Sequence, residues 1–160
     1  MAAPDAFAKN VQDWTRGVDA RIALDARQVA FKLFEKVILK TPVDTGAARN
    51  SWGVSVGAIR PPTPSAGAEA VVSSGGIGAM SVAVAASPVG GVVWLSNGLP
   101  YIRVLEYGLY PNPPQRGSWV KGRKGQPGHW EIKSVNGYSR QAPQGMVRLS
   151  ITEMQTEFRT

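Results

Sequence analysis

Residues 5–40 read DAFAKNVQDWTRGVDARIALDARQVAFKLFEKVILK, and this stretch decides the fold because it predicts one long helix. Apolar side chains recur along it at intervals of four, three, four and four residues, which places them on a single helical face. That face begins with Phe7, Val11, Trp14, Val18 and Ile22 and continues through Val29, Leu33 and Val37. Asp5 is the expected N-cap. The helix should end at Thr41, because a residue that precedes proline disfavours helical geometry.

The predicted helix is longer than a compact domain of this size needs. At about 1.5 Å per residue it would extend for about 50 Å. The chain has 160 residues, which favours a single domain spanning 1–160 with one modest core. Two explanations for the excess length stay open: Gly17 interrupts the helix, or the N-terminal part of the helix packs on another subunit.

The segment Thr41-Pro42-Val43-Asp44-Thr45-Gly46 predicts a stiff turn after the helix. Pro42 fixes its own φ angle, and Gly46 tolerates a positive φ. The carboxylate of Asp44 can accept hydrogen bonds from backbone N–H groups close by in the chain. We therefore expect a structural connector between the helix and a following strand.

The middle of the chain predicts short strands separated by loops. Residues 47–57 alternate larger side chains with serine and glycine, as a half-buried strand does. Residues 58–76 are rich in Pro, Gly, Ser and Ala and predict a flexible loop. Residues 77–87 combine alanines that favour helix with alternating valines that favour strand, so both structures stay open. Residues 92–95 predict a short buried strand.

Two further helices are expected in the second half. Pro100 suits a first helical turn, and Gly108 is a natural C-cap. Glu106 lies among aromatic and apolar neighbours in this helix, and we expect it to pair with Arg103 or with another arginine that folding brings close. The last helix should start near Pro143. Its apolar face consists of Val147, Ile151, Met154 and Phe158.

Together these elements predict an α+β fold. The long N-terminal helix and the C-terminal helix would pack on a small, mainly antiparallel sheet with long Gly/Pro-rich loops. The uncharged stretch 70–102 is too often interrupted by glycine, serine and proline to predict a membrane span. The N-terminal residues lack the basic start and the apolar run of a signal peptide.

Residues 109–137 predict a basic excursion inserted between two helices. Residues 118–121 and 129–133 can pair as a hairpin, with Trp119, Trp130 and Ile132 as packing groups. Between residues 116 and 140, six basic side chains stand against one glutamate. Such a loop is either a solvated surface or a contact surface, because basic groups attract phosphates and aromatic faces stack on bases. The candidate contact residues for a partner or DNA are Arg116, Trp119, Lys121, Arg123, Lys124, Trp130 and Lys133.

The composition leaves few routes to catalysis. The chain has no cysteine and a single histidine, His129, which argues against thiolate or multi-histidine metal sites. It has neither a P-loop nor the G-x-S-x-G nucleophile elbow, and its carboxylates form no closely spaced cluster. We therefore expect no catalytic residues, no metal site and no cofactor. The net charge of +7 favours acidic or phosphate-bearing partners.

The long first helix is followed by four short segments in a distinctive order. They are Pro42-Val43-Asp44-Thr45-Gly46 running into Ala48-Arg49-Asn50-Ser51-Trp52, Asn97 with Leu99-Pro100-Tyr101, Leu105-Glu106-Tyr107-Gly108, and Ser139-Arg140-Gln141-Ala142-Pro143-Gln144-Gly145-Met146-Val147. In this order they resemble the phage tail-component family of the lambdoid gene-product-ten type, whose members are tail-completion or neck proteins. The motif residues that carry the resemblance best are Pro42, Asp44, Gly46, Tyr101, Glu106 and Gly108.

This resemblance implies a structural virion protein without catalytic residues, cofactors or membrane contact. The subunit would be a small α+β unit of a hexameric ring at the head–tail interface, assembled in the host cytoplasm. Its neighbours would be a head-closure or connector protein on one side and a tail terminator or tail tube protein on the other. The excursion 109–137 departs from the family pattern, and its basic side chains would meet an acidic partner or the DNA in the channel. The alternative is a basic nucleic-acid-binding protein that uses the loop 116–140.

Overall fold

The longest element of the computed structural model is α1, Ala3–Lys40, a helix of 38 residues that continues through Gly17. The structure describes residues 3–62, 74–122 and 125–159. The predicted long helix is confirmed, and the alternative in which Gly17 interrupts it is wrong. The helix begins at Ala3, so Asp5 lies in the first turn rather than at the N-cap. Its negative charge is still favourable there because it complements the helix dipole.

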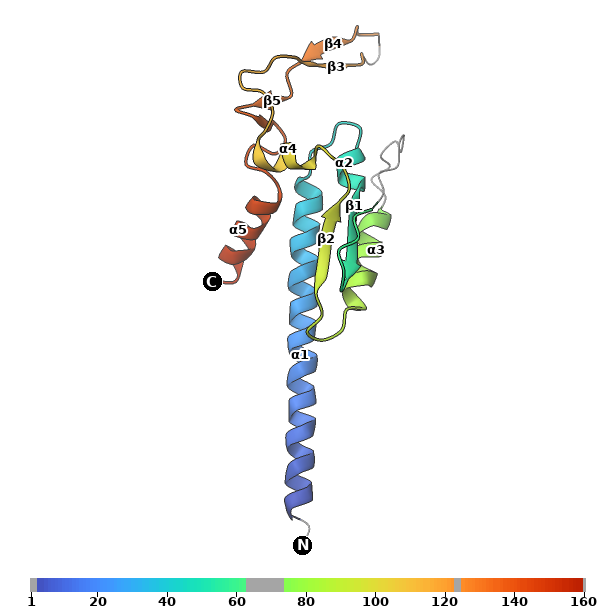
Figure 1. Ribbon diagram of the computed structural model, residues 1–160, viewed down its shortest axis with the longest axis vertical. Coiled ribbons are helices and arrows are strands. Elements are labelled where there is room, and N and C mark those ends of the chain that lie inside the picture. Colours follow the sequence, from blue (N-terminus) through green and yellow to red (C-terminus); the bar gives the residue numbers. More distant parts are fainter. Residues whose placement is uncertain (1–2, 63–73, 123–124, 160) are drawn as a thin grey trace.

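Only the C-terminal half of α1 packs against the remainder of the chain. The other elements gather around that half, while the N-terminal half projects beyond them (Figure 1). Every side chain from residue 5 to residue 22 is exposed except that of Val18, which is half-buried, and Ala23 is the first buried residue along the helix. We call residues 3–22 the arm and the other described residues the body.

A two-stranded antiparallel sheet lies at the centre of the body. Its strands, β1 (Trp52–Val56) and β2 (Val93–Asn97), pair in register from Trp52 with Asn97 to Val56 with Val93. One face of the sheet packs against both α1 and the helix α3, Ser74–Ala85. The buried cluster between them consists of Phe34, Ile38, Met80 and Val84. Residues 57–62 cover part of the other face, where Trp94 donates a 3.0 Å hydrogen bond to the carbonyl of Gly57.

A second buried cluster joins the end of α1 to the helices α2 (Ala47–Asn50), α4 (Ile102–Tyr107) and α5 (Val147–Glu157). Its buried members are Val37, Ala48, Leu105 and Met146. From this cluster α5 runs back along α1, where Lys40 lies 2.9 Å from Glu153 and Lys36 lies 2.5 Å from Glu157. The C-terminal helix therefore packs mainly on α1 rather than on the sheet.

The turn after α1 leads into a helix, which corrects the prediction of a strand over 47–57. Gly46 adopts φ 85° and reverses the chain, and residues 47–50 then form α2 before β1 begins. The Arg49 guanidinium donates hydrogen bonds to the carbonyls of Leu39, at 2.8 Å, and Thr41, at 2.9 Å. These carbonyls lie at the end of α1, where no further helical N–H can reach them. Their capping by Arg49 favours the short helix over the strand.

Two other boundaries also differ from expectation. The open choice at 77–87 resolves as helix, because α3 covers Ser74–Ala85. The predicted loop 58–76 is therefore too long at its end, and its residues 63–73 lie outside the described residues. The last helix begins at Val147 rather than near Pro143, since residues 142–145 make isolated β-bridges first.

The excursion and the two residues that follow it form two small antiparallel hairpins at the end of the molecule opposite the arm (Figure 1). The first pairs β3 (Ser118–Val120) with β4 (His129–Glu131), so the predicted hairpin is confirmed. The second pairs β5 (Ser134–Val135) with β6 (Tyr138–Ser139). With three two-stranded sheets and five helices among the described residues, the chain has the predicted α+β fold.

Candidate functional site

The four motif segments converge on the second buried cluster, although they are far apart in sequence. The amide of Asn97 donates a 2.8 Å hydrogen bond to the carbonyl of Ala48, which ties the end of β2 to α2. The amide side chain of Gln141 makes two hydrogen bonds to the backbone of Val43, one accepted from its N–H at 2.7 Å and one donated to its carbonyl at 2.9 Å. These contacts join β2 to α2 and the last segment to the turn.

Glu106 acts as the cap of α5. Its carboxylate accepts hydrogen bonds from the backbone N–H groups of Met146 and Val147, both at 2.8 Å, and of Arg148, at 3.0 Å. These N–H groups have no partner within the helix, because a helix leaves its first amides unpaired. The guanidinium of Arg148 also donates to the Glu106 carboxylate, at 3.4 Å, so the expected arginine partner is Arg148 and not Arg103.

Gly108 ends α4 in the left-handed conformation, at φ 66°, as a C-cap glycine should. A β-carbon at this position would overlap the ring of Tyr138, so the close approach of β6 also requires glycine. The same ring carries the hydroxyl that accepts a 3.1 Å hydrogen bond from Arg148. At the end of α4, Gly108 therefore allows β6 to approach, and Glu106 fixes the start of α5.

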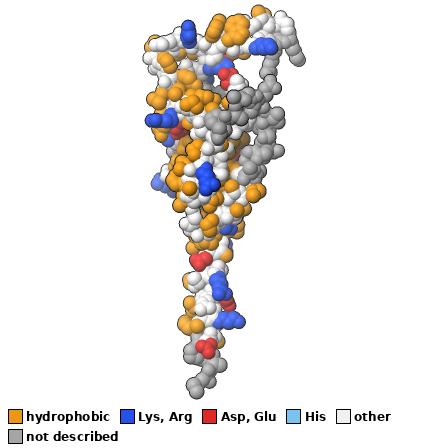
Figure 2. Space-filling model, turned by 45° about the vertical axis from the view of Figure 1, so that its right-hand side comes forward, with side chains coloured by type: hydrophobic (Ala, Val, Ile, Leu, Met, Phe, Trp, Pro, Cys, Tyr) orange, Lys and Arg blue, Asp and Glu red, His pale blue; other side chains and the backbone are white. Residues whose placement is uncertain are grey.

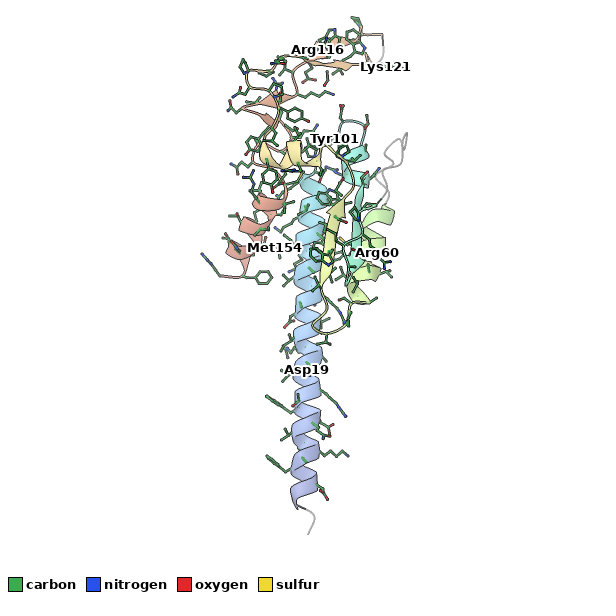
Figure 3. All side chains as sticks on the ribbon, viewed as in Figure 1. Asp19, Arg60, Tyr101, Arg116, Lys121 and Met154 are labelled. Atoms are coloured by element: carbon green, nitrogen blue, oxygen red, sulfur yellow. The ribbon has the colours of Figure 1, made fainter. Side chains whose placement is uncertain are left out.

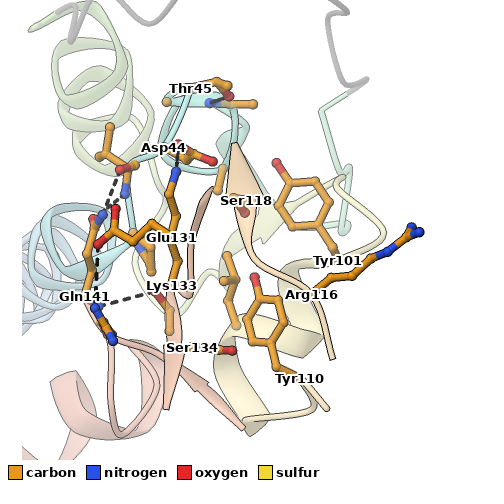
Figure 4. Close-up of a pocket in the computed structure, with 18 residues that line it drawn as sticks. Asp44, Thr45, Tyr101, Tyr110, Arg116, Ser118, Glu131, Lys133, Ser134 and Gln141 are labelled. Carbon is orange, nitrogen blue, oxygen red and sulfur yellow. Dashed lines mark hydrogen bonds and ion pairs between the residues drawn. The ribbon is translucent and has the colours of Figure 1, made fainter. Parts of the chain in front are cut away.

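A cavity of about 380 Å³ lies between the turn at 42–46, α4 and the base of the excursion (Figure 4). Lys133 spans it and donates a 2.6 Å hydrogen bond to Asp44, so Asp44 ties the excursion to the turn rather than capping its own backbone. Glu131 pairs with Arg140 at 3.6 Å. The guanidinium of Arg116 points away from the cavity (Figure 4). The ion pairs around the cavity thus connect the excursion to the turn and to the segment that follows the excursion.

Two tyrosines complete the wall of this cavity (Figure 4). The pKa of Tyr101 is raised by burial and then by the charge of Asp44. The pKa of Tyr110 is raised by burial first, then by Tyr101 and Asp44. Both hydroxyls therefore stay protonated at neutral pH and serve as neutral hydrogen-bonding groups.

The basic hairpin presents its two tryptophans to solvent. Trp119 and Trp130 pair across β3 and β4 with their ring centres 5.6 Å apart in an edge-on arrangement. They retain 56% and 69% of their surface, so their expected role as packing groups is wrong within a single subunit. Arg116 and Lys121 are exposed beside them, whereas Lys133 is engaged with Asp44. The remaining candidates, Arg123 and Lys124, lie outside the described residues.

The arm exposes much of the apolar helical face that the sequence pattern predicted. We call Phe7, Val11, Trp14, Val18 and Ile22 the arm stripe. Phe7 retains 71% of its surface and Trp14 retains 70%, and hydrophobic side chains lie open on the narrow projecting part (Figure 2). Asp19, which lies on the arm, is far from Met154 on α5 (Figure 3). Exposed apolar surface of this extent marks an interaction site.

Two features escaped the sequence reasoning. The buried hydroxyl of Thr41 donates to the carbonyl of Val37 and accepts from the indole N–H of Trp52, both at 2.8 Å, and so links α1 to β1. An apolar groove also runs between α1 and α5, where Ile151, Met154 and Phe158 face α1. The spacing of apolar residues in the last helix predicted its apolar face, but it did not predict that this face lies against α1.

Comparisons add no relative to this picture: no protein-family model, no curated protein and no solved structure matches the chain. Within the described ranges, no helix is both long and apolar enough to cross a membrane. In the same ranges, no three acidic, histidine or cysteine side chains lie close enough to hold a metal ion.

Proposed function

We propose that this chain is a structural assembly protein of a bacteriophage head–tail junction, where copies of it form a ring that joins the head-side connector to the tail. The phage assignment rests on the ordered motif segments and their resemblance to the tail-component family. The assembly assignment rests on one observation in the structure, which is the exposed arm stripe.

The placement of the motif residues supports a framework role for them. Gly46 and Gly108 set backbone turns, Glu106 caps α5, and Asp44 latches the excursion through Lys133. None of these roles requires a substrate. A family of subunits that shares such residues would share the body and the positions of the surfaces that the body carries.

The arm supports self-association more directly. A helix that projects from its domain and exposes two aromatic rings on one face gains stability when another surface covers that face. A ring in which each subunit meets its neighbours through two different surfaces supplies such a cover. We propose a hexamer by resemblance, with a head-closure protein and a tail terminator or tail tube protein above and below it.

Imaging tests this proposal in two steps. Purified protein examined by negative-stain electron microscopy should show closed rings, and light scattering should give a mass of several subunits. In the parent virion, antibody labelling should mark the neck, and particles that lack the protein should separate into filled heads and free tails. Labelling along the tail shaft or on the capsid faces would refute the assignment.

The exposed tryptophan pair on the basic hairpin favours a second candidate function, which is binding to nucleic acid. Aromatic faces stack on unpaired bases, and the neighbouring cations neutralise phosphates. A gel shift with single- and double-stranded DNA at 50 mM and 200 mM salt tests this. Affinity should fall steeply with salt and should drop on Trp119→Ala with Trp130→Ala. Equal migration with and without protein at low salt would exclude it.

A further inference from the structure

The groove between α1 and α5 has the shape and chemistry of a helix receptor. It has a volume of about 340 Å³ and is lined mainly by Val29, Leu33, Ile151, Met154 and Phe158. Ile151 and Phe158 keep 39% and 59% of their surface, so the α5 side of the groove is open to an incoming group. Two packed helices with an apolar channel between them accept the apolar face of a third helix.

The groove and the arm stripe lie on the same face of α1. Val11 of the stripe and Val29 of the groove are 18 residues apart, which is about five full turns of a helix with 3.6 residues per turn. Because α1 is one continuous helix, the arm cannot fold back onto the groove of its own subunit. An arm that enters this groove must come from a second copy of the chain.

We propose that the arm of one subunit lies in the α1–α5 groove of the next subunit, where Phe7, Val11 and Trp14 are the anchoring side chains. Their i, i+4, i+7 spacing is the one with which a helix fills a groove between two others. The inference rests on the self-association proposed above and adds to it the two surfaces that meet.

The charges of the arm agree with this occupant. The charged side chains of the arm are Asp5, Lys9, Asp13, Arg16, Asp19 and Arg21. At about 100° per residue, the first four point to the side of the helix opposite the stripe, whereas Asp19 and Arg21 flank the stripe near its C-terminal end. Docking of the anchoring side chains therefore buries apolar atoms on both sides and leaves the first four charges in water, which avoids the cost of burying them.

The apolar area of the stripe is that of a small protein interface. A buried Phe or Trp contributes about 150–250 Å² each, so Phe7 and Trp14 together supply a large part of the interface. With the exposed parts of Val11 and Ile22 added, the stripe offers on the order of 500 Å² for burial, which is less than the roughly 800 Å² per partner of a standard protein interface. Since the arm and groove are different surfaces, the contact is heterologous, and its repetition produces a ring or a filament.

Paired surface variants test the inference in the full chain. The arm variant combines Phe7→Ser with Trp14→Ser, and the groove variant combines Ile151→Ser with Phe158→Ser. Controls on the opposite helix faces are Lys9→Ser with Arg16→Ser, and Thr152→Ala with Thr156→Ala. All eight positions are exposed, so circular dichroism should report an unchanged fold. Analytical ultracentrifugation should show that both test variants weaken self-association by at least about tenfold, as loss of an aromatic anchor does, and that both controls assemble normally.

Mixing the two variants separates this contact from a symmetric pairing of two arms. Each mixture retains one intact groove, on the arm variant, and one intact arm, on the groove variant. The mixture should therefore give dimers and nothing larger. A groove variant that assembles like the wild type, or a mixture that stays monomeric, would overturn the inference.

Cross-linking supplies a readout that does not depend on loss of assembly. The chain has no cysteine, so Val11→Cys with Ile151→Cys introduces only the intended pair. A bismaleimide should then produce a ladder of covalent multimers, whereas Val11→Cys with Val135→Cys should not. Efficient dimers from Val11→Cys alone would indicate arm-to-arm pairing instead and would contradict the inference.

The outcomes for the proposed function are distinct from these. If the wild-type protein forms neck rings that survive the arm substitutions, the inference fails and the proposed function stands. If the arm and groove cross-link in a protein that is absent from the virion neck, the inference stands and the proposed function fails. A wild-type chain that stays monomeric at all concentrations overturns the inference directly.

Discussion

The two halves of α1 carry the same kind of apolar pattern in different surroundings. In the body half, Phe34 keeps 8% of its surface and packs against α3 and the sheet, whereas in the arm Phe7 keeps 71%. The helix itself is equally regular in both halves. Burial in this protein is therefore decided by which surfaces the remainder of the chain can bring to the helix. The arm lies beyond their reach.

The largest effect expected from this contrast comes from removing one phenyl ring from each half. Phe34→Ala should lower the free energy of unfolding by about 3–5 kcal/mol, because it removes buried contacts and leaves a cavity. Phe7→Ala should change the stability of the isolated subunit by no more than about 0.5 kcal/mol. Urea denaturation at a concentration where the protein is monomeric measures both. Similar losses from the two substitutions would mean that the arm packs on its own subunit.

A somewhat smaller effect is expected at the cap that holds α5 beside α1. Glu106→Ala should cost about 2–3 kcal/mol, because it leaves backbone N–H groups of α5 without an acceptor in a largely buried site. Glu106→Gln should cost less, since its amide retains one acceptor oxygen. Arg103→Ala is the control, as Arg103 is exposed on the same helix. Hydrogen exchange should show the loss concentrated in residues 146–150, and a uniform loss across the body would contradict a capping role.

The sequence predicted those features whose cause is local. The periodicity of α1, the turn glycine Gly46, the C-cap Gly108 and the β3–β4 hairpin follow from spacing or backbone freedom, and all are present in the structure. Glu106 was correctly expected to meet an arginine. That this arginine is Arg148, and that the carboxylate caps a helix, depends on contacts across some 40 residues that no local pattern encodes.

The failures also have physical reasons. The alternation at 47–57 predicted a strand from the start, but Arg49 caps the end of α1 and draws residues 47–50 into a helical turn. The tryptophans of the hairpin were expected to pack because large aromatic residues are usually buried. In this chain they meet each other on an exposed hairpin and belong to neither of the buried clusters found among the described residues. As in the arm, the sequence showed apolar groups without showing what covers them.

Glycine substitutions sharpen the same contrast with a smaller effect. Gly17 lies in the arm, and no atom beyond the neighbouring backbone of its own helix lies within 4 Å of the place that a β-carbon would take, so Gly17→Ala should stabilise the arm helix by about 0.5–1 kcal/mol. Gly108→Ala should instead destabilise the body by at least about 1 kcal/mol, because alanine is strained at φ 66° and meets the Tyr138 ring. Hydrogen exchange of the arm amides and chemical denaturation of the body report the two changes. Stability changes of the same sign from the two substitutions would contradict this contrast between the arm and the body.

The smallest effect is expected at the ion pairs that bind α5 to α1. The pKa of Glu153 is lowered, first by the hydrogen bond from Lys40 and also by Lys36. A carboxyl group whose pKa is lowered by folding stabilises the folded protein at pH values above its ordinary pKa of 4.5. This stabilisation is lost as the pH falls through the lower pKa that the group has in the folded protein. The pKa of Lys36 is raised, mainly by its hydrogen bond to Glu157, so its contribution is complete below 10.5 and is lost only at higher pH.

Thermal melting of Glu153→Gln tests this assignment against a matched pair in the arm. The wild type should melt slightly above Glu153→Gln at pH 7, and the difference should shrink as the pH falls below 4.5 and also in 1 M salt, since exposed pairs are screened. Asp13→Asn removes the arm pair between Asp13 and Arg16, which are 3.7 Å apart and both exposed, and it should leave the melting temperature unchanged over the same pH range. A Glu153→Gln deficit that stays constant as the pH falls would mean that packing rather than charge holds α5 on α1. In that case the α5 wall of the groove would form without these ion pairs, and the body half of α1 would differ from the arm through apolar contacts alone.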